Sequence, residues 1–431
     1  MDELRRRLRE EVVASFDYSE EITEEDLYRR IDKFIMQAAK DQYLPLEKKE
    51  KLRREVFASI RGLDILEEIL LEENITEIMI NGAEDIFLEE GGKIHRWGGK
   101  FESGQKLEDI VQLIVAKANR IVNEANPIVD ARLSDGSRVN VILPPVALNG
   151  PIVTIRKFSK EPFTMTKLME IGAITSQAAE FLKLLVEAKY NIFICGGTGS
   201  GKTTFLNALT AFIPGNERII TIEDAAELKV NGIENLVRLE VRNKNTEGVG
   251  EISIRELIRT SLRMRPDRII VGEVRGAETI DMLQAMNTGH DGSLSTGHGN
   301  SIPDMLDRLE TMILLGSDIP LAAVRRQIAS AIDIMVHLGR LRDGRRCVLE
   351  ISEILGCRDG EIEVNPLFVY QEDSDSETGE LKRTGAVFVQ QMKLKRAGKK
   401  EWSTGGEAGD AEDSSNRADC VPAGTDGLAV L

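Results

Sequence analysis

The N-terminal part of the chain repeats apolar residues at the spacing of an α-helix. Each of three stripes at three- and four-residue intervals indicates an amphipathic helix. The stripes are Leu4, Leu8, Val12 and Phe16, then Leu27, Ile31, Phe34 and Ile35, then Leu52, Val56 and Ile60. Thr23 followed by Asp26 is typical of a helix start, and Gly62 is well placed to end the third helix. Residues 1–62 are therefore predicted to form an N-terminal helical segment.

Residues 63–158 mix the period of a strand with that of a helix. Strand-like runs occupy 75–82, 85–97, 135–145 and 150–158, and the second run turns at Gly91-Gly92 as a hairpin would. Helix spacing joins Leu107, Ile110, Val111, Ile114 and Ala118 between these runs. We expect a compact α/β domain here, followed by a linker at 159–175.

The next part of the chain alternates apolar strands with helical spacing. The strands are NIFIC (191–195), RIITI (218–222), RIIVG (268–272) and GSLST (292–296). This alternation predicts a largely parallel sheet covered by helices. A hairpin around Asp343-Gly344 is expected within 332–355. Residues 176–392 are thus predicted to be a second, larger α/β domain.

Composition narrows the class of protein. A net charge of −16 disfavours a protein that coats nucleic acid. No apolar run approaches the roughly 18 residues of a membrane span, and the N-terminus lacks the apolar stretch of a secretory signal. The four cysteines form no CxxC pair, which suits a reducing cytosol. Residues 401–431 contain seven acids and one base, so 393–431 is predicted to be a disordered acidic tail.

A basic cluster lies in the first predicted helix. Its members are Arg5, Arg6, Arg7 and Arg9. They are candidates for contact with an anionic membrane surface. The alternative interpretation is a solvated helix face.

The most specific motif is GGTGSGKTT, which fits the pattern G-x-x-x-x-G-K-[ST]. Glycines let several backbone N–H groups turn toward one anion, and the helix that follows adds its positive end. The lysine would reach the β- and γ-phosphates, and the first threonine hydroxyl would bind Mg²⁺. The candidate nucleotide-binding residues are Gly196, Gly197, Thr198, Gly199, Ser200, Gly201, Lys202, Thr203 and Thr204.

Carboxylates follow two of the other predicted strands. Glu273 ends RIIVGE, at the edge of a parallel sheet where ligands bind, and an acid there can hold Mg²⁺ or polarise water. Glu223 and Asp224 follow RIITI. Glu223 is the candidate catalytic carboxylate, one water away from the γ-phosphate. The alternative has Asp224 as a helix N-cap and Glu223 as a bystander.

Two of the four histidines lie in the glycine-rich segment TGHDGSLSTGHGNS. They are His290 and His298. A histidine at the end of a strand can donate a hydrogen bond to a terminal phosphate and sense its loss. An ordinary structural histidine is the alternative for either. His95 and His337 lie in predicted strands and are interpreted as structural.

Taken together, these segments resemble the type II/type IV secretion ATPase superfamily. GGTGSGKTT is similar to its P-loop, ITIEDAAEL to its aspartate box, RIIVGEVRGAE to its Walker B box and TGHDGSLSTGHGNS to its histidine box. Within it, ITEIMINGAEDIFLEEGGKI, EANPIVDARLSDGSRVNVILPP and LRMRPDRIIVGEVRGAE resemble the CpaF/TadA branch, the tight-adherence (Tad/Flp) pilus assembly ATPases. The four-cysteine zinc module of the GspE/PilB branch is absent from the sequence.

The resemblance implies a RecA-like P-loop motor domain behind a smaller N-terminal α/β domain, assembled as a homohexameric ring. ATP would lie between the domains, with Lys202 and Thr203 on phosphates and Mg²⁺. Glu273 would hold the metal, Glu223 would be the catalytic carboxylate and His298 the γ-phosphate sensor. The implied partner is an integral inner-membrane platform protein, so the protein would be cytoplasmic and peripheral to the inner face of the membrane.

Arginines are the remaining candidates, because a developing γ-phosphate charge needs cationic neighbours. Arg138 and Arg156 lie in the N-terminal domain, where the family brings basic residues onto the nucleotide, and Arg132 is a third candidate. The motor domain offers further arginines at Arg238, Arg242, Arg263, Arg265 and Arg275. Surface salt bridging is the alternative for any one of them.

Two other functions compete with the secretion motor. One is a RecA-like nucleic-acid-dependent ATPase, or a related type IV secretion/DNA-transfer ATPase. Net charge and an aromatic content of 5% weigh against a basic, base-stacking channel. The other is a non-catalytic scaffold that binds nucleotide in order to assemble.

Overall fold

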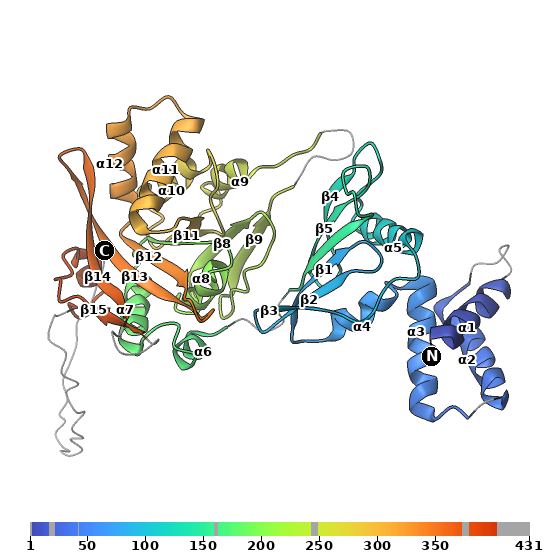
Figure 1. Cartoon of the computed structure of the whole chain (residues 1–431). Helices are drawn as coiled ribbons and strands as arrows, with labels where there is room; N and C mark the ends of the chain where they lie inside the picture. Colours follow the sequence, from blue (N-terminus) through green and yellow to red (C-terminus); the bar gives the residue numbers. More distant parts are fainter. Residues whose placement is uncertain are drawn as a thin grey trace, which may run out of the picture.

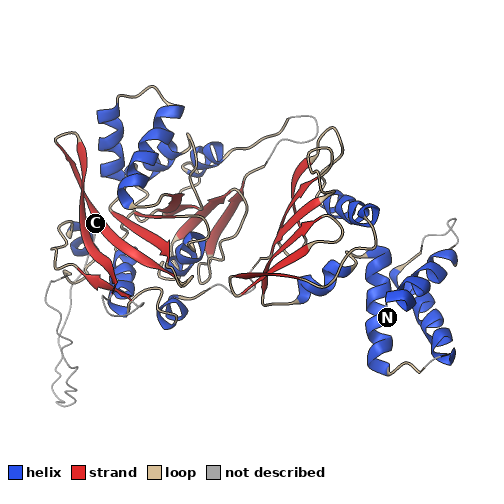
Figure 2. Cartoon of the chain, in the orientation of Figure 1, coloured by secondary structure: helices blue, strands red, loops and turns tan. Residues whose placement is uncertain are grey.

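The computed structural model describes residues 2–16, 22–41, 43–158, 163–242, 249–372 and 379–402. Three units follow one another in space in their order along the chain: a helical bundle, a small sheet domain and a larger α/β domain (Figure 1). Figure 2 shows the strands confined to the second and third units. No helix of the described residues is both long and apolar enough to cross a bilayer.

The first unit is a bundle of α1 (Asp2–Ala14), α2 (Glu24–Asp41) and α3 (Leu46–Arg61). Its core consists of the apolar stripes found in the sequence, with Leu8, Val12, Leu27 and Leu52 almost completely buried. Gly62 ends α3, as the sequence predicts. These three helices are therefore confirmed.

The basic cluster of α1 is partly engaged within the chain. Arg9 pairs with Glu102 of the neighbouring domain at 2.5 Å, and Arg7 pairs with Glu11 at 3.2 Å. These pairings favour the solvated-face interpretation over membrane contact for both arginines.

The second unit is an antiparallel sheet in the order β3-β2-β1-β6-β5-β4. Its strands are β1 (Ile75–Asn81), β2 (Ile86–Glu90), β3 (Lys93–Arg96), β4 (Ile128–Arg132), β5 (Arg138–Ile142) and β6 (Ile152–Arg156). Two helices, α4 (Ile65–Leu71) and α5 (Gly104–Lys117), contribute their apolar faces to the same core. Ser103 caps α5 by accepting a hydrogen bond from Lys106 N. The hairpin expected at 85–97 is present as β2–β3.

The third unit is built on a sheet in the order β15-β14-β13-β12-β7-β11-β10-β8-β9. From β12 to β9 all neighbours are parallel, and from β12 to β15 they are antiparallel. The parallel strands are β7 (Ile192–Gly196), β8 (Arg218–Glu223), β9 (Asn235–Glu240), β10 (Arg268–Val271), β11 (Leu294–His298) and β12 (Ile334–Arg340). The rest are β13 (Arg346–Arg358), β14 (Glu361–Glu372) and β15 (Gly379–Arg383). All residues of β7 and β10 are buried, which explains their apolar runs; Arg268, the first residue of β10, is the charged exception.

Helices cover both faces of this sheet. Buried residues of α7 and α8 belong to one core cluster, and buried residues of α10, α11 and α12 belong to another. The helices are α6 (Met165–Glu170), α7 (Ser176–Glu187), α8 (Lys202–Thr210), α9 (Ile254–Ser261), α10 (Thr279–Asn287), α11 (Ile302–Gly316), α12 (Leu321–Ala331) and α13 (Met392–Arg396). This confirms an α/β fold with a parallel central sheet, and the RecA-like architecture expected for it.

Two segments assigned to a linker and a tail from the sequence pack against this domain. Within 159–175, α6 places Met165 and Leu168 in the core; residues 159–162 lie outside the described part. Beyond 392, Leu394 is fully buried and the ring of Trp402 lies 4.9 Å from that of Phe181. The chain from 393 to 402 is thus ordered against the larger α/β domain, whereas 403–431 lie outside the described residues.

Candidate functional site

The glycine-rich segment 196–204 joins β7 to α8 at the carboxyl edge of the parallel sheet. Gly196 has no room for a side chain, because a β-carbon there would lie 2.5 Å from both Leu338 O and Ser200 Oγ. Gly201 has φ 94°, a left-handed conformation that glycine adopts without strain, and it begins α8. The helix therefore starts directly behind the loop, with its free N–H groups and positive end at this edge. Thr203 and Thr204 lie in its first turn, half-buried.

Lys202 points back over this loop. Its ammonium donates to Gly196 O at 3.1 Å and Gly197 O at 3.0 Å, and lies 3.2 Å from His298 Nδ1. Burial lowers the pKa of Lys202, although the carboxylate of Glu273 opposes this effect. The lysine is thus a partly desolvated cation at the loop, which strengthens its attraction to a phosphate.

His298 connects Lys202 to the Walker B carboxylate. It ends β11, and its Nε2 lies 2.7 Å from Glu273 Oε1. With Nδ1 facing an ammonium and Nε2 facing a carboxylate, the neutral tautomer with a proton on Nε2 suits the charges on both sides, although Nε2 and Oε1 are in close contact without an aligned hydrogen bond. Burial lowers the pKa of His298, which favours this neutral form. Three candidates from separate parts of the sequence therefore form one continuous chain of contacts.

Arg275 joins the acids of two strands. Its guanidinium contacts Glu273 Oε2 at 2.7 and 3.1 Å and Asp224 Oδ2 at 3.1 Å. Burial opposes its charged form, but the hydrogen bond and charge of Glu273 prevail and raise the pKa of Arg275. The sequence indicated Arg275 only as one of several available arginines. Its position two residues after Glu273 was the signal that could have selected it.

Glu223 is held at the end of β8, beside Gly272. Its Oε1 accepts hydrogen bonds from Glu227 N at 2.8 Å and Leu228 N at 3.0 Å, while Oε2 is buried without a partner among the described residues. Burial raises the pKa of Glu223 despite these two hydrogen bonds. No helix begins at Asp224, since the chain from 224 to β9 is irregular, so the helix-cap alternative is wrong.

The small sheet domain brings its candidate arginines to the larger α/β domain. Arg138 donates to Ala225 O at 3.1 Å and pairs with Glu227 at 3.0 Å. Arg132 pairs with Glu240 at 3.0 Å. Arg132 and Arg138 are opposite each other, where β4 ends and β5 begins. This end of the small sheet therefore contacts the segment that follows β8.

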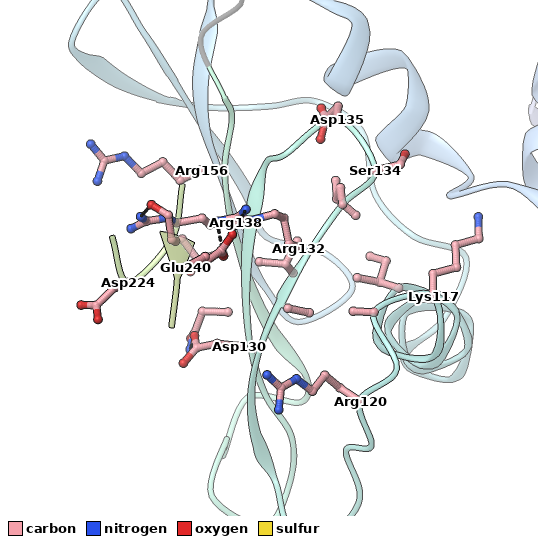
Figure 3. Close-up of a pocket in the computed structure, with 18 of the residues that line it drawn as sticks. Lys117, Arg120, Asp130, Arg132, Ser134, Asp135, Arg138, Arg156, Asp224 and Glu240 are labelled. Atoms are coloured by element: carbon pink, nitrogen blue, oxygen red, sulfur yellow. Dashed lines mark hydrogen bonds and ion pairs between the residues drawn. The ribbon is translucent and has the colours of Figure 1, made fainter. Parts of the chain in front are cut away.

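Two neighbouring cavities lie between the domains. The larger, of about 1000 Å³, is lined by Arg132, Arg138 and Arg156 on one side and by Asp224 and Arg275 on the other. Figure 3 shows Arg132, Arg138 and Arg156 on the small-domain side of this cavity, with Asp224 and Glu240 facing them. The smaller, of about 180 Å³, contains the same three arginines and reaches Thr203 and Thr204. The three arginines thus line both cavities, which together form one interdomain cleft, and the P-loop threonines line the smaller of the two.

Other histidines lie apart from this edge. His290 precedes β11, at the opposite end of that strand from His298, and its Nδ1 faces Ala285 O at 3.2 Å. His337 is buried in β12 next to Cys195, and His95 is exposed in β3. Among the four histidines, only His298 therefore contacts Lys202 and Glu273 within the described part of the chain.

Oxygen ligands for Mg²⁺ are present at the loop. The Thr203 hydroxyl and the Glu273 carboxylate are the donor types that this ion prefers, and substrate phosphates usually supply further ligands. Glu273 is only partly exposed, with 19% of its side chain accessible, and its charge is balanced by Arg275. The donor set fits a magnesium–nucleotide complex.

The chain matches the family of type II/IV secretion system proteins over residues 61–408. It is 36% identical over 332 residues to a putative conjugal transfer protein of Mycobacterium tuberculosis, covering 74% of this chain and 93% of that protein. It is 33% identical over 319 residues to the type IV secretion system protein PtlH of Bordetella pertussis, covering 67% of this chain and 93% of PtlH.

The fold is similar to that of a solved motor protein. The structure of the pilus retraction motor PilT with bound ADP aligns with a TM-score of 0.51 and 20% identity, covering 70% of this chain and 84% of that chain. At this identity the likeness extends to the fold alone.

Proposed function

Because the chain belongs to the type II/IV secretion system protein family, we propose that it is a hexameric ATP-hydrolysing motor that powers assembly of a Tad/Flp-like pilus or protein secretion through a membrane platform. The observation that carries this proposal is the chain of contacts from Lys202 through His298 to Glu273, beside a cleft that arginines of a second domain also line. Such a site can hold a triphosphate and respond to its hydrolysis.

The residues of the cleft take complementary roles. Lys202 and the N–H groups of the P-loop bind the β- and γ-phosphates, and Thr203 and Glu273 hold Mg²⁺, which neutralises phosphate charge when bound. Glu223 orients the attacking water. Burial raises the pKa of Glu223 toward the pKa of an effective general base. His298 gives its contact with Lys202 up to the γ-phosphate and regains it after hydrolysis.

Arg138 and Arg156 couple hydrolysis to motion. Both belong to the small domain and line the cavity that reaches Thr203, so a bound triphosphate draws the two domains together. ATP binds the closed arrangement of the two domains more tightly than the open one. This difference in affinity determines how far ATP shifts the equilibrium toward closure. Around a ring, opening and closing of this cleft would move the platform protein, with the motor at the inner face of the cell membrane.

A DNA-transfer motor is the second candidate, because relatives carry conjugal transfer in their names. Net charge of −16 weighs against a basic channel, yet the same ATPase cleft would serve either function. Stimulation of hydrolysis by single-stranded DNA separates the two.

The test is ATP hydrolysis by the purified full chain, with and without Mg²⁺ and single-stranded DNA, with molar mass measured by light scattering in ATP. Lys202→Ala should abolish nucleotide binding, whereas Glu223→Gln should bind ATP but lose turnover by a factor on the order of 100 or more. Glu234→Gln, an exposed carboxylate near the same segment, is the matched control and should keep full turnover.

Mg²⁺-dependent turnover that ignores DNA, in particles of six subunits, supports the secretion motor. Strong DNA stimulation supports the DNA-transfer motor instead. A chain that binds ATP without turnover, even when the platform protein is added, contradicts the motor and supports a nucleotide-binding scaffold.

A further inference from the structure

The hairpin between β12 and β13 carries a concentration of positive charge at the P-loop edge of the sheet. Its arginines are Arg340, Arg342, Arg345 and Arg346. Arg345 pairs with Asp343 at 2.5 Å. Within the described part of the chain, the other three make no ion pair or hydrogen bond through their guanidinium groups, and all three are exposed.

The register of the strands places this hairpin beside the P-loop. Leu338 is opposite both Gly196, the last residue of β7, and Val348 of β13. The pair Arg340 and Arg346 comes two residues further along, so it lies beyond the end of β7, level with the loop. The Arg346 Cδ lies 3.9 Å from the position that a β-carbon on Gly201 would take, which is van der Waals contact.

Side-chain alternation determines the face on which these arginines lie. Leu338 and Val348 belong to the core cluster that contains α8, and side chains two residues apart in a strand share a face. Arg340 and Arg346 therefore project on the side of α8, over the start of the P-loop helix. They lie directly opposite each other, and like charges at such a pair are destabilising unless an anion lies between them.

The residues on the two sides of β7 determine how a bound nucleotide would be oriented. β7 has β11 and β10 on one side and β12 and β13 on the other. Lys202 meets His298 of β11, and His298 in turn meets Glu273, which follows β10. A nucleotide whose terminal phosphate lies at Lys202 and Glu273 extends its remaining part away from them, toward the β12–β13 hairpin.

We propose that Arg346, supported by Arg340 opposite it, binds the nucleoside end of the nucleotide, that is, its α-phosphate and base. This inference rests on the proposed nucleotide-binding function and adds a contact on the opposite side of the loop from the catalytic residues. A guanidinium suits both parts, because it donates charge-assisted hydrogen bonds to phosphate and its planar face stacks on a ring.

The experiment compares two ligands by calorimetry on the full chain. ADP contains the α-phosphate and base, whereas pyrophosphate contains neither and still fills the P-loop. Arg346→Ala should weaken ADP binding about tenfold or more, as expected for loss of a charged hydrogen bond, and leave pyrophosphate binding unchanged. The ADP affinity of Arg346→Lys should lie between those of the wild type and Arg346→Ala, because lysine keeps the charge but lacks the planar, bidentate guanidinium group. Unchanged pyrophosphate binding also shows that the variants are folded.

Arg342→Ala is the matched control, because it removes the same charge from the turn of the same hairpin. It should leave the affinity for both ligands unchanged. An unaltered ADP affinity in Arg346→Ala, an equal loss of pyrophosphate binding, or an equal loss in Arg342→Ala would each overturn the inference. Wild type that binds ADP but does not hydrolyse ATP, even with the platform protein added, would contradict the motor alone, and wild type that does not bind ADP would contradict both.

Discussion

His298 and Glu273 lie in direct contact, with 2.7 Å between Nε2 and Oε1, although His298 ends β11 and Glu273 comes two residues after the end of β10. The other ring nitrogen of His298 faces the ammonium of Lys202 at 3.2 Å. A proton on that nitrogen would place two positive charges in contact, so the arrangement requires a neutral imidazole. The histidine thus links the P-loop lysine to Glu273 through the two nitrogens of one ring.

The first prediction concerns the pH dependence of hydrolysis. Burial lowers the pKa of His298 below its ordinary value of 6.5, so the neutral form persists at pH 6.5 and is lost only at lower pH. Turnover measured from pH 5 to 8 should therefore stay level down through pH 6.5 and fall below it. His298→Gln should reduce turnover about 100-fold and leave only the acidic fall that protonation of Glu223 causes. His290→Gln should behave like wild type, and a wild-type fall centred above pH 7 would contradict the assignment.

The second prediction separates a role on phosphate from a role in domain docking. Arg138 pairs with Glu227 at 3.0 Å across the domain boundary. If Arg138 stabilises the γ-phosphate, Arg138→Ala should lower turnover by about 10³, whereas Glu227→Gln should have a far smaller effect. Steady-state kinetics of both variants provide the comparison. Equal losses would assign Arg138 to docking instead.

A third prediction concerns a buried ion pair between the first residue of β10 and the residue just before β8. Arg268 is completely buried and contacts Glu217 at 2.6 and 2.9 Å. Glu217→Ala would leave this guanidinium without its carboxylate, which should lower the free energy of unfolding by about 3–5 kcal/mol. Urea denaturation of the variant measures this loss. Glu170→Ala breaks the exposed pair with Lys167 and should cost about 1 kcal/mol or less; a similar loss in both variants would refute the prediction.

The fourth prediction tests where the motor domain ends. Phe388 and Leu394 are almost completely buried, and Trp402 packs on Phe181. A chain ending at 402 should keep the melting temperature of the full protein. A chain ending at 387 should melt well below it, because each lost apolar side chain contributes about 2–5 kcal/mol. Equal melting temperatures for both truncations would show that the segment adds nothing to stability.

The sequence alone identified the features that depend on residues close together along the chain. The P-loop from Gly196 to Thr204 is a local motif, and the buried strands β7 and β10 contain the apolar runs Ile192–Cys195 and Ile269–Val271. The three N-terminal helices followed from spacing, because a helix buries every third or fourth residue. Strands with a weaker pattern, such as β9 and β14, were not singled out, since their side chains are mostly exposed or only half-buried.

The tertiary structure decided which of these features meet. Lys202 and His298 are 96 residues apart, and Arg138 and Ala225 are 87 apart. Periodicity shows which side of an element is buried, but not which element lies beside it. The sheet order β12-β7-β11-β10-β8 brings strands together that do not follow one another along the chain. For this reason the sequence showed Arg340 and Arg346 only as part of a hairpin, whereas strand register placed them beside the P-loop.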